Sequence, residues 1–523
     1  MTSRRARWFV IGLGGALVAL TILAGAGSRT QTLRELVVDT LSERLDSEVE
    51  LQYFSVDTFP TVRIRGEGLV LRHRGRRDVP PLIAVQRFEI NGGLLGLFVR
   101  PQRFRVVHLD GLQISIPPGG ISNSRPWRTA PGSGAVKAEG DDGDTPSMLV
   151  DRLEARNASL ALIPRKAGRA PRVFAVHALH TRRLGFGEPM AFTATLTNPV
   201  PKGLIETRGT FGPWRKRDPG QTNLTGTYSF DADLSTVKGI AGALQSTGKF
   251  GGRLERIDVE GETRTPDFRV TTGSGPVPLA TTFKAVVDGT DGDTHLNAVF
   301  ATFQQTSLFA KGAIVDTPGV KGHSIKLHVK IDKGRIEDVL RLAVKSDRPL
   351  LKGGVAIHTD FDLQPGKADV MDRLKLAGEF DVDAGRFPDP EVQAKVIEMS
   401  RRARGKANDD REVDVASDLR GKFRLDAAVL TLRDTTFGIP GATVQIGGSY
   451  GLRTEQLEFD GSMRMQATVS QVAGGGAKSF VLKIVDPLFR KDGAGAVLPI
   501  KVRGTRQQPK FGLDIGRALR PGK

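Results

Sequence analysis

A two-residue alternation of apolar and polar side chains runs through most of this chain beyond residue 48, and it restricts the folds open to it. Three runs show the alternation most clearly, and each places its apolar members on one face of a strand: Ile325, Leu327, Val329 and Ile331; Val355, Ile357, Phe361 and Leu363; and Leu457, Phe459, Met463, Met465 and Val469. Polar residues such as Lys326, Asp360 and Glu458 fall on the opposite face. The pattern predicts a long series of strands, each with one apolar face.

Two segments show helical spacing instead. Residues 32–46 begin with a capping-box pattern, and their apolar members are Leu33, Leu36, Val37, Leu41 and Leu45. Residues 390–404 follow the N-cap candidate Asp389 and carry the apolar stripe Val392, Val396, Met399 and Ala403. We expect the first helix to pack on the end of the following sheet, with a position on a membrane surface as the alternative.

Two helices are too few to cover the apolar faces of so many strands, so the sheet must fold over on itself. It then encloses either a dry core, as in a sandwich or β-solenoid, or a long apolar groove. Periodicity does not separate these two, and the low aromatic content of 6% favours the groove. The expected fold class is therefore mainly β, with a few short helices and an elongated, largely antiparallel sheet folded lengthwise into an apolar groove.

The N-terminus predicts the location of this sheet. Arg4, Arg5 and Arg7 precede an uncharged, largely apolar run over residues 8–27. Twenty helical residues span about 30 Å, the thickness of a bilayer's hydrocarbon core, and the arginines place the N-terminus in the cytoplasm. A cleavable signal peptide is the alternative, because residues 24–26 resemble a cleavage site. Both interpretations export the body, and we favour the transmembrane anchor.

The net charge of +18 predicts an anionic partner. The densest basic stretch contains Arg63, Arg65, Arg72, Arg74, Arg76 and Arg77. It lacks the interleaved aromatic residues of a nucleic-acid surface and follows the anchor on its exported side, so we expect lipid head groups or the membrane surface, and no nucleic acid. The alternative is a solvated basic edge that deters aggregation between sheets.

The sequence contains few residues in patterns that could carry out catalysis. The chain has no cysteine, which excludes disulfides, thiolate metal sites and cysteine nucleophiles. Carboxylates two residues apart occur as Asp231/Asp233, Asp360/Asp362 and Asp381/Asp383, but their alternation with apolar residues turns them towards solvent. We therefore predict no catalytic residue, no metal and no cofactor. A carbohydrate-active β-solenoid enzyme remains an alternative.

Several short motifs give the chain a resemblance to the AsmA-like family, the bacterial relatives of the bridge-like lipid-transfer proteins. Near the N-terminus they are Phe59-Pro60, Ile64-Arg-Gly66, Pro81-Leu-Ile-Ala-Val85, Leu94-Leu-Gly-Leu97 and Leu109-Asp-Gly-Leu-Gln-Ile114. Towards the C-terminus they are Val415-Ala-Ser-Asp-Leu419, Phe437-Gly-Ile-Pro-Gly-Ala442, Val469-Ser-Gln471, Asp486-Pro-Leu-Phe489 and Pro509-Lys-Phe-Gly-Leu-Asp514. With the Pro- and Gly-rich interruption at 117–147, they suggest six segments: cytoplasmic tail 1–7, anchor 8–27, N-terminal region 28–116, flexible insertion 117–147, β-groove body 148–388 and C-terminal region 389–523.

The resemblance implies a single-pass protein of the bacterial inner membrane, with its body in the periplasm, that handles phospholipid in outer-membrane biogenesis and is not an enzyme. Its implied partners are phospholipid, the inner membrane and outer-membrane assembly proteins. The alternative is a non-conducting scaffold or assembly factor. The alternation marks eleven groove candidates: Ile325, Leu327, Val329, Ile331, Val355, Ile357, Phe361, Leu457, Phe459, Met463 and Met465.

Overall fold

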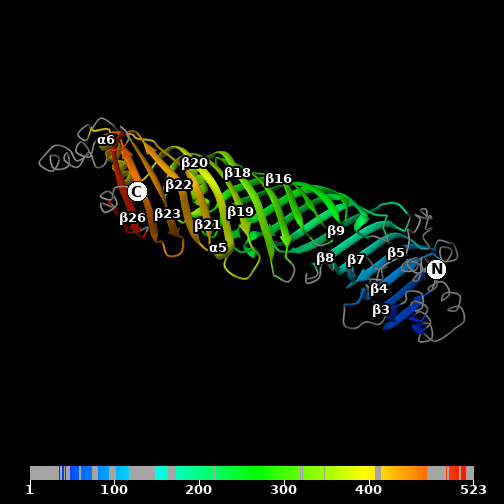
Figure 1. Cartoon of the computed structure of the whole chain (residues 1–523). Coiled ribbons are helices and arrows are strands. Elements are labelled where there is room, and N and C mark those ends of the chain that lie inside the picture. Colours follow the sequence, from blue (N-terminus) through cyan, green and yellow to red (C-terminus); the bar gives the residue numbers. More distant parts are fainter. Residues whose placement is uncertain are drawn as a thin grey trace, which may run out of the picture. The chain divides into compact units, whose positions relative to one another are not determined.

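The chain is mainly β, as the alternation predicts, with a large antiparallel sheet and few helices (Figure 1). This computed structural model describes residues 34–35, 38–39, 42, 47–57, 61–73, 80–93, 102–116, 148–162, 172–185, 187–213, 215, 219–290, 292–317, 320, 322–346, 348–406, 414–467, 490–491, 494–505 and 508–513. They fall into two compact units. Unit 1 contains Met1–Thr236, Leu244–Glu262 and Lys284–Thr294, and unit 2 contains Val237–Ala243, Thr263–Phe283 and His295–Lys523.

Unit 1 begins with eleven strands and two 3-10 turns: β1 (Ser47–Glu50), β2 (Tyr53–Asp57), β3 (Val62–His73), β4 (Ile83–Gly92), β5 (Gln102–Asp110), β6 (Gln113–Ile116), β7 (Met148–Leu162), β8 (Arg172–Leu184), β9 (Met190–Pro199), β10 (Lys202–Phe211), η2 (Pro219–Gln221), β11 (Asn223–Asp233) and η3 (Leu234–Thr236). β5 and β6 pair with β7 in parallel, whereas β7–β8–β9–β10–β11 is an antiparallel series. Four strands contribute residues to both units: β13 (Ala243–Arg253), β14 (Arg256–Val270), β15 (Val277–Val287) and β16 (Thr294–Phe303).

The start of unit 1 has a dry core. Phe54, Ile64 and Phe104 are buried in a cluster built by β1 to β5 and β7. Val38 packs against this cluster, and the described residues around it, 34–35, 38–39 and 42, are helical. The contact agrees with a helix packed on the sheet rather than on a membrane.

The remaining elements of unit 2 are β12 (Ile240–Ala241), β17 (Thr306–Asp316), β18 (His323–Arg335), α4 (Ile336–Ala343), β19 (Lys352–Leu363), α5 (Val370–Arg373), β20 (Leu374–Arg386), α6 (Pro390–Ala403), β21 (Ser417–Asp426), β22 (Val429–Ile439), β23 (Ala442–Gly451), β24 (Leu457–Met465), β25 (Arg490–Lys491), β26 (Ala494–Gly504) and β27 (Pro509–Leu513). From β17 to β24 each strand pairs antiparallel with the next one in sequence, and β26 and β27 extend the series. Figure 1 shows β18 to β23 side by side.

The helices of unit 2 lie at the ends of these strands. α6 confirms the helix expected from the sequence, and the Asp389 carboxylate accepts hydrogen bonds from the N–H groups of Glu391 and Val392. The predicted stripe needs one correction: Val396 and Ala403 are buried as expected, but Val392 is 39% exposed. Val392 lies only about 40° around the helix from Val396, so it is on the same side, but it belongs to the first turn of α6, one turn before the buried residues.

Glycines of the apolar face lie opposite aromatic rings on neighbouring strands. Gly378 of β20 pairs with Phe423 of β21, and Phe380 pairs with Gly421 in the reciprocal arrangement. Gly448 of β23 likewise pairs with Phe459 of β24. At Gly378 and Gly421 an added Cβ would first meet the neighbouring strand on the other side, at the His358 carbonyl oxygen of β19 and the Thr435 side chain of β22, whereas at Gly448 it would also meet the Phe459 ring.

The close approach at these glycines predicts a large effect of adding one methyl group. A Cβ at Gly378 would lie 2.2 Å from the carbonyl oxygen of His358. We expect Gly378→Ala to lower the free energy of unfolding by about 1–3 kcal/mol through overpacking. Gly447→Ala is the matched control, because its Cβ would lie 3.5 Å from the nearest atom. Thermal unfolding followed by circular dichroism measures both, and equal melting temperatures would contradict the prediction.

No helix among the described residues is long and apolar enough to cross a membrane. The expected anchor at 8–27 and the insertion at 117–147 lie outside the described residues. The division between the two units falls within residues 148–388, the range expected to form one β-groove body.

Candidate functional site

The sequence candidates of unit 2 meet on one apolar face. Strand register builds a continuous row across β18 to β24, formed by Leu327, Phe361, Leu376, Leu425, Leu430, Tyr450 and Leu457. A second row of the same face runs through Val355, Val382, Leu419, Phe437, Val444 and Met463. Leu327 and Leu457 are thus part of one surface although they are far apart in sequence.

The other candidates lie on the same face. Ile325, Val329 and Ile331 share it by alternation along β18, and Ile331 pairs with Ile357. Phe459 and Met465 share it along β24, where they pair with Gly448 and Ala442. The predicted alternation therefore gave the correct face for all eleven residues. Val469, the last apolar residue of that run, lies outside the described residues.

Among the described residues, helices cover this face at one end of the strands only. α4 connects β18 to β19, and its Ile336 packs with Val355 and Val382. α6 connects β20 to β21 at the same end, and its Val396 packs with Met465. α5 connects β19 to β20 at the opposite end, which Figure 1 shows below the strands, and none of its residues is buried.

Side chains of the apolar face are buried beneath the helices and only half-buried away from them. Val355 is 4% exposed and Met465 is 3% exposed beneath the helices. Ile325, Leu327, Val329 and Phe361 are only half-buried. Side chains in a packed interior have neighbours on all sides, so half-burial leaves this stretch of the face open to a further apolar group.

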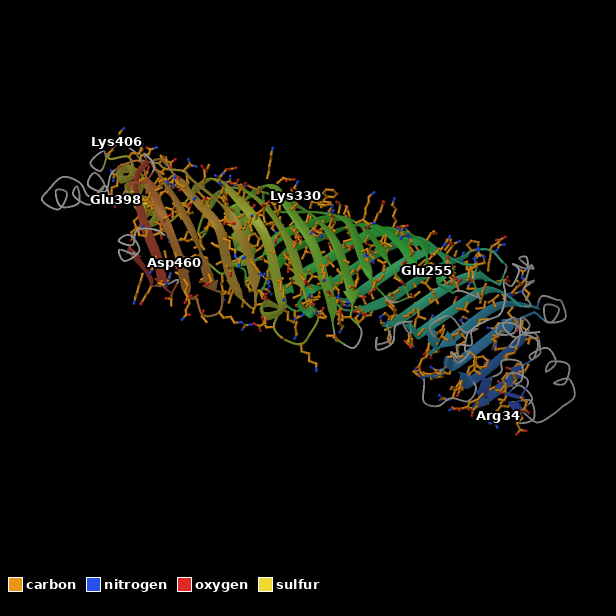
Figure 2. All side chains as sticks on the ribbon, viewed as in Figure 1. Arg34, Glu255, Lys330, Glu398, Lys406 and Asp460 are labelled. Atoms are coloured by element: carbon orange, nitrogen blue, oxygen red, sulfur yellow. The ribbon has the colours of Figure 1, made fainter. Side chains whose placement is uncertain are left out.

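The opposite face of the same strands is charged. His328 and Asp360 are hydrogen-bonded, and Lys326 pairs in register with Asp362. Lys330, labelled in Figure 2, lies 2.9 Å from the Asp332 carboxylate, and its hydrogen bond is the main cause that holds the pKa of Asp332 below its usual value. These strands thus separate an apolar face from a polar one.

The paired carboxylates belong to the polar face. Asp231, Asp233, Asp360, Asp381 and Asp383 are exposed, and a hydrogen bond from the Ser235 hydroxyl is the main cause that lowers the pKa of Asp233. A glycosidase acid needs the opposite shift, a raised pKa. Among the described residues no group of three or more His, Asp or Glu side chains is arranged to hold a metal ion.

The basic residues of unit 1 are matched by acidic ones. Arg63 and Arg65 both lie 3.5 Å from the Glu89 carboxylate, and Arg72 lies 3.5 Å from that of Glu50. A hydrogen bond from Asn91 is the largest cause that lowers the pKa of Glu89, and the two arginines add to it. Arg74, Arg76 and Arg77 lie outside the described residues.

Arg65 and Glu89 also line a hollow of about 660 Å³ formed by residues of β2, β3, β4, β5 and β7. Its charges alternate from strand to strand, because Glu67 pairs in register with Arg87, Arg87 with Asp110 and Asp110 with Arg156. Neighbouring opposite charges neutralise one another, so the hollow does not present the concentrated positive charge that an anionic head group needs.

Sequence reasoning missed several residues of the apolar face: Leu376, Phe380, Phe423, Leu425, Leu432 and Tyr450. In β20 and β21 the two-residue alternation is regular through Leu376, Phe380, Phe423 and Leu425, so it was a signal that could have found these four. The Gly-x-aromatic spacing of Gly378 with Phe380 and of Gly421 with Phe423 was a second signal for the two rings. In β22 a register shift between Leu432 and Thr435 breaks the alternation.

Comparisons with known proteins leave the family open. No family model, no curated protein and no solved structure matches the chain.

Proposed function

We propose that this chain binds phospholipid along the apolar face of unit 2 and handles it in the bacterial envelope, as the AsmA-like resemblance implies. One observation carries the proposal: Ile325, Leu327, Val329 and Phe361 are half-buried on a continuous apolar face that the helices cover at one end. Acyl chains are the ligand that such a face would shield from water.

The face supports a groove better than a scaffold with a dry interior. In a filled interior the row from Leu327 to Leu457 would be buried throughout, as Phe54 and Phe104 are at the start of unit 1. The proposal includes an N-terminal anchor in the inner membrane, a periplasmic body and a role without catalysis. The anchor and location rest on the arginines and apolar run of the N-terminus.

A photoreactive phenylalanine analogue tests the proposal at two positions of β19. At Phe361 it lies on the apolar face, and at His358 it lies on the charged face of the same strand. After purification from bacterial membranes and irradiation, we expect lipid adducts at 361 and none at 358, as judged by mass spectrometry. Adducts at 361 that contain only protein would favour the scaffold, and equal lipid labelling at both positions would refute a specific face.

A further inference from the structure

A short segment between β11 and β13 contacts α5 from far away in the sequence. Lys238 donates a hydrogen bond from Nζ to the backbone oxygen of Lys367 at 3.4 Å, across a separation of 129 residues. Gly239 has a φ of +92°, and a Cβ there would lie 3.3 Å from Cγ2 of Val370. All of these residues belong to unit 2.

The same segment is fixed on its other side to the end of β14. Ile240 and Ala241 form β12, which pairs with Val270 and Arg269. The N–H of Thr271 donates to the Gly239 oxygen at 3.0 Å.

The turn after β14 continues the connection to α4. The N–H of Ser274 donates to the Arg341 oxygen at 2.8 Å, and the Ser274 hydroxyl donates to the Val344 oxygen at 2.7 Å. A chain of contacts therefore runs from α4, through residues 271–276 and 237–241, to α5.

This chain of contacts joins the two ends of β19. α4 precedes β19 and α5 follows it, so the two helices lie at opposite ends of that strand. α4 packs on the apolar face through Ile336. We propose that residues 237–241 and α5 form a clasp that closes the apolar path over β19 and β20, and that it must part before a lipid head group can pass. This inference rests on the proposed lipid binding and adds the step that controls passage.

Two sets of contacts hold α5: ion pairs with Arg453 and a smaller contact with residues 237–241. Arg453 holds α5 through ion pairs with Asp369 at 3.2 Å and Asp372 at 3.0 Å. Two described contacts join the segment to the start of α5: the exposed hydrogen bond to Lys367, three residues before the helix, and the approach of Gly239 to Val370. Neither belongs to a strand ladder. The segment can therefore separate from α5 without breaking the sheet, as expected of an element that opens during function.

The absence of cysteine gives a clean test. Lys238→Cys and Lys367→Cys are introduced together into the full chain, which is loaded with fluorescent phospholipid from donor vesicles. A short bis-maleimide then bridges the pair, and exchange of bound lipid with acceptor vesicles is followed by fluorescence. We expect bridging to slow exchange by about tenfold or more, since passage then depends on an element that no longer opens.

The control pair is Lys311→Cys with His328→Cys, which are in register on the charged face, so bridging them should leave exchange unchanged. A loaded chain that exchanges lipid equally fast with the 238–367 bridge formed would overturn the clasp, as would failure of that pair to form the bridge. A chain that takes up no lipid in any form would instead refute the proposed lipid binding, and the clasp's role with it.

Discussion

Replacing Leu327 with lysine is expected to leave the protein folded but to reduce the phospholipid recovered with it by about tenfold. The side chain is half-buried, so a lysine at this position can extend its ammonium group to water. Acyl chains avoid the charge, and a penalty of about 1.4 kcal/mol is enough for a tenfold loss. Lipid phosphate in the purified protein, measured against protein concentration, gives the result.

His328→Lys is the matched control for this change. It places a lysine one residue along β18, on the charged face, where the ammonium group can pair with Asp360. We expect normal lipid content from this variant. If Leu327→Lys unfolds while His328→Lys does not, the interior is packed around Leu327 and the scaffold alternative becomes the better explanation.

Removing the Asp338 carboxylate is expected to cause the largest loss of stability among the variants considered. Asp338 is buried at the start of α4, and its Oδ2 accepts hydrogen bonds from the Gln305 N–H at 3.0 Å and the Thr306 hydroxyl at 2.8 Å. Thr306 is fully buried and in turn accepts from the Arg335 N–H at 2.9 Å. Asp338→Ala leaves buried donors without an acceptor, so we expect a loss of about 2–4 kcal/mol in the free energy of unfolding.

Two variants check that mechanism by urea unfolding. Asp338→Asn keeps a side-chain oxygen that can accept, and should retain part of the stability. Asp332→Ala removes an exposed carboxylate from β18 and should change stability by less than about 0.5 kcal/mol. An Asp338→Ala protein as stable as the parent would show that the bonds do not hold α4 on the sheet.

Alternation along β18, β19 and β24 was enough to predict strands, faces and the mainly β fold, because each strand is regular and apolar on one side. α6 was predictable because Asp389 and Pro390 mark its start. α4 was missed: its N-cap residue, Arg335, provides no side-chain cap, and Ile336 continues directly from β18. Its helically spaced apolar residues Ile336, Val339 and Leu340 span little more than one turn.

The candidate site was predictable only as a set of faces. Alternation shows which side of a strand is apolar, whereas contacts between distant segments depend on how the sheet curves. Nothing in the sequence around Lys238 or Val370 indicates that they meet. The charge pairs of Arg63 and Arg65 were hidden for the same reason, since their partner Glu89 lies on another strand.

The pairing of β17 to β24 between neighbours in sequence has a consequence for how this part of the chain forms. Each new strand needs only the preceding one as a template, and the short turns, such as those from β21 to β22 and from β22 to β23, cost little loop entropy to close. Low contact order of this kind favours rapid assembly, and it lets the sheet grow from its N-terminal end while later strands are still emerging. It also makes length easy to change, because a hairpin can be inserted or deleted with new bonds needed only at its two flanking strands.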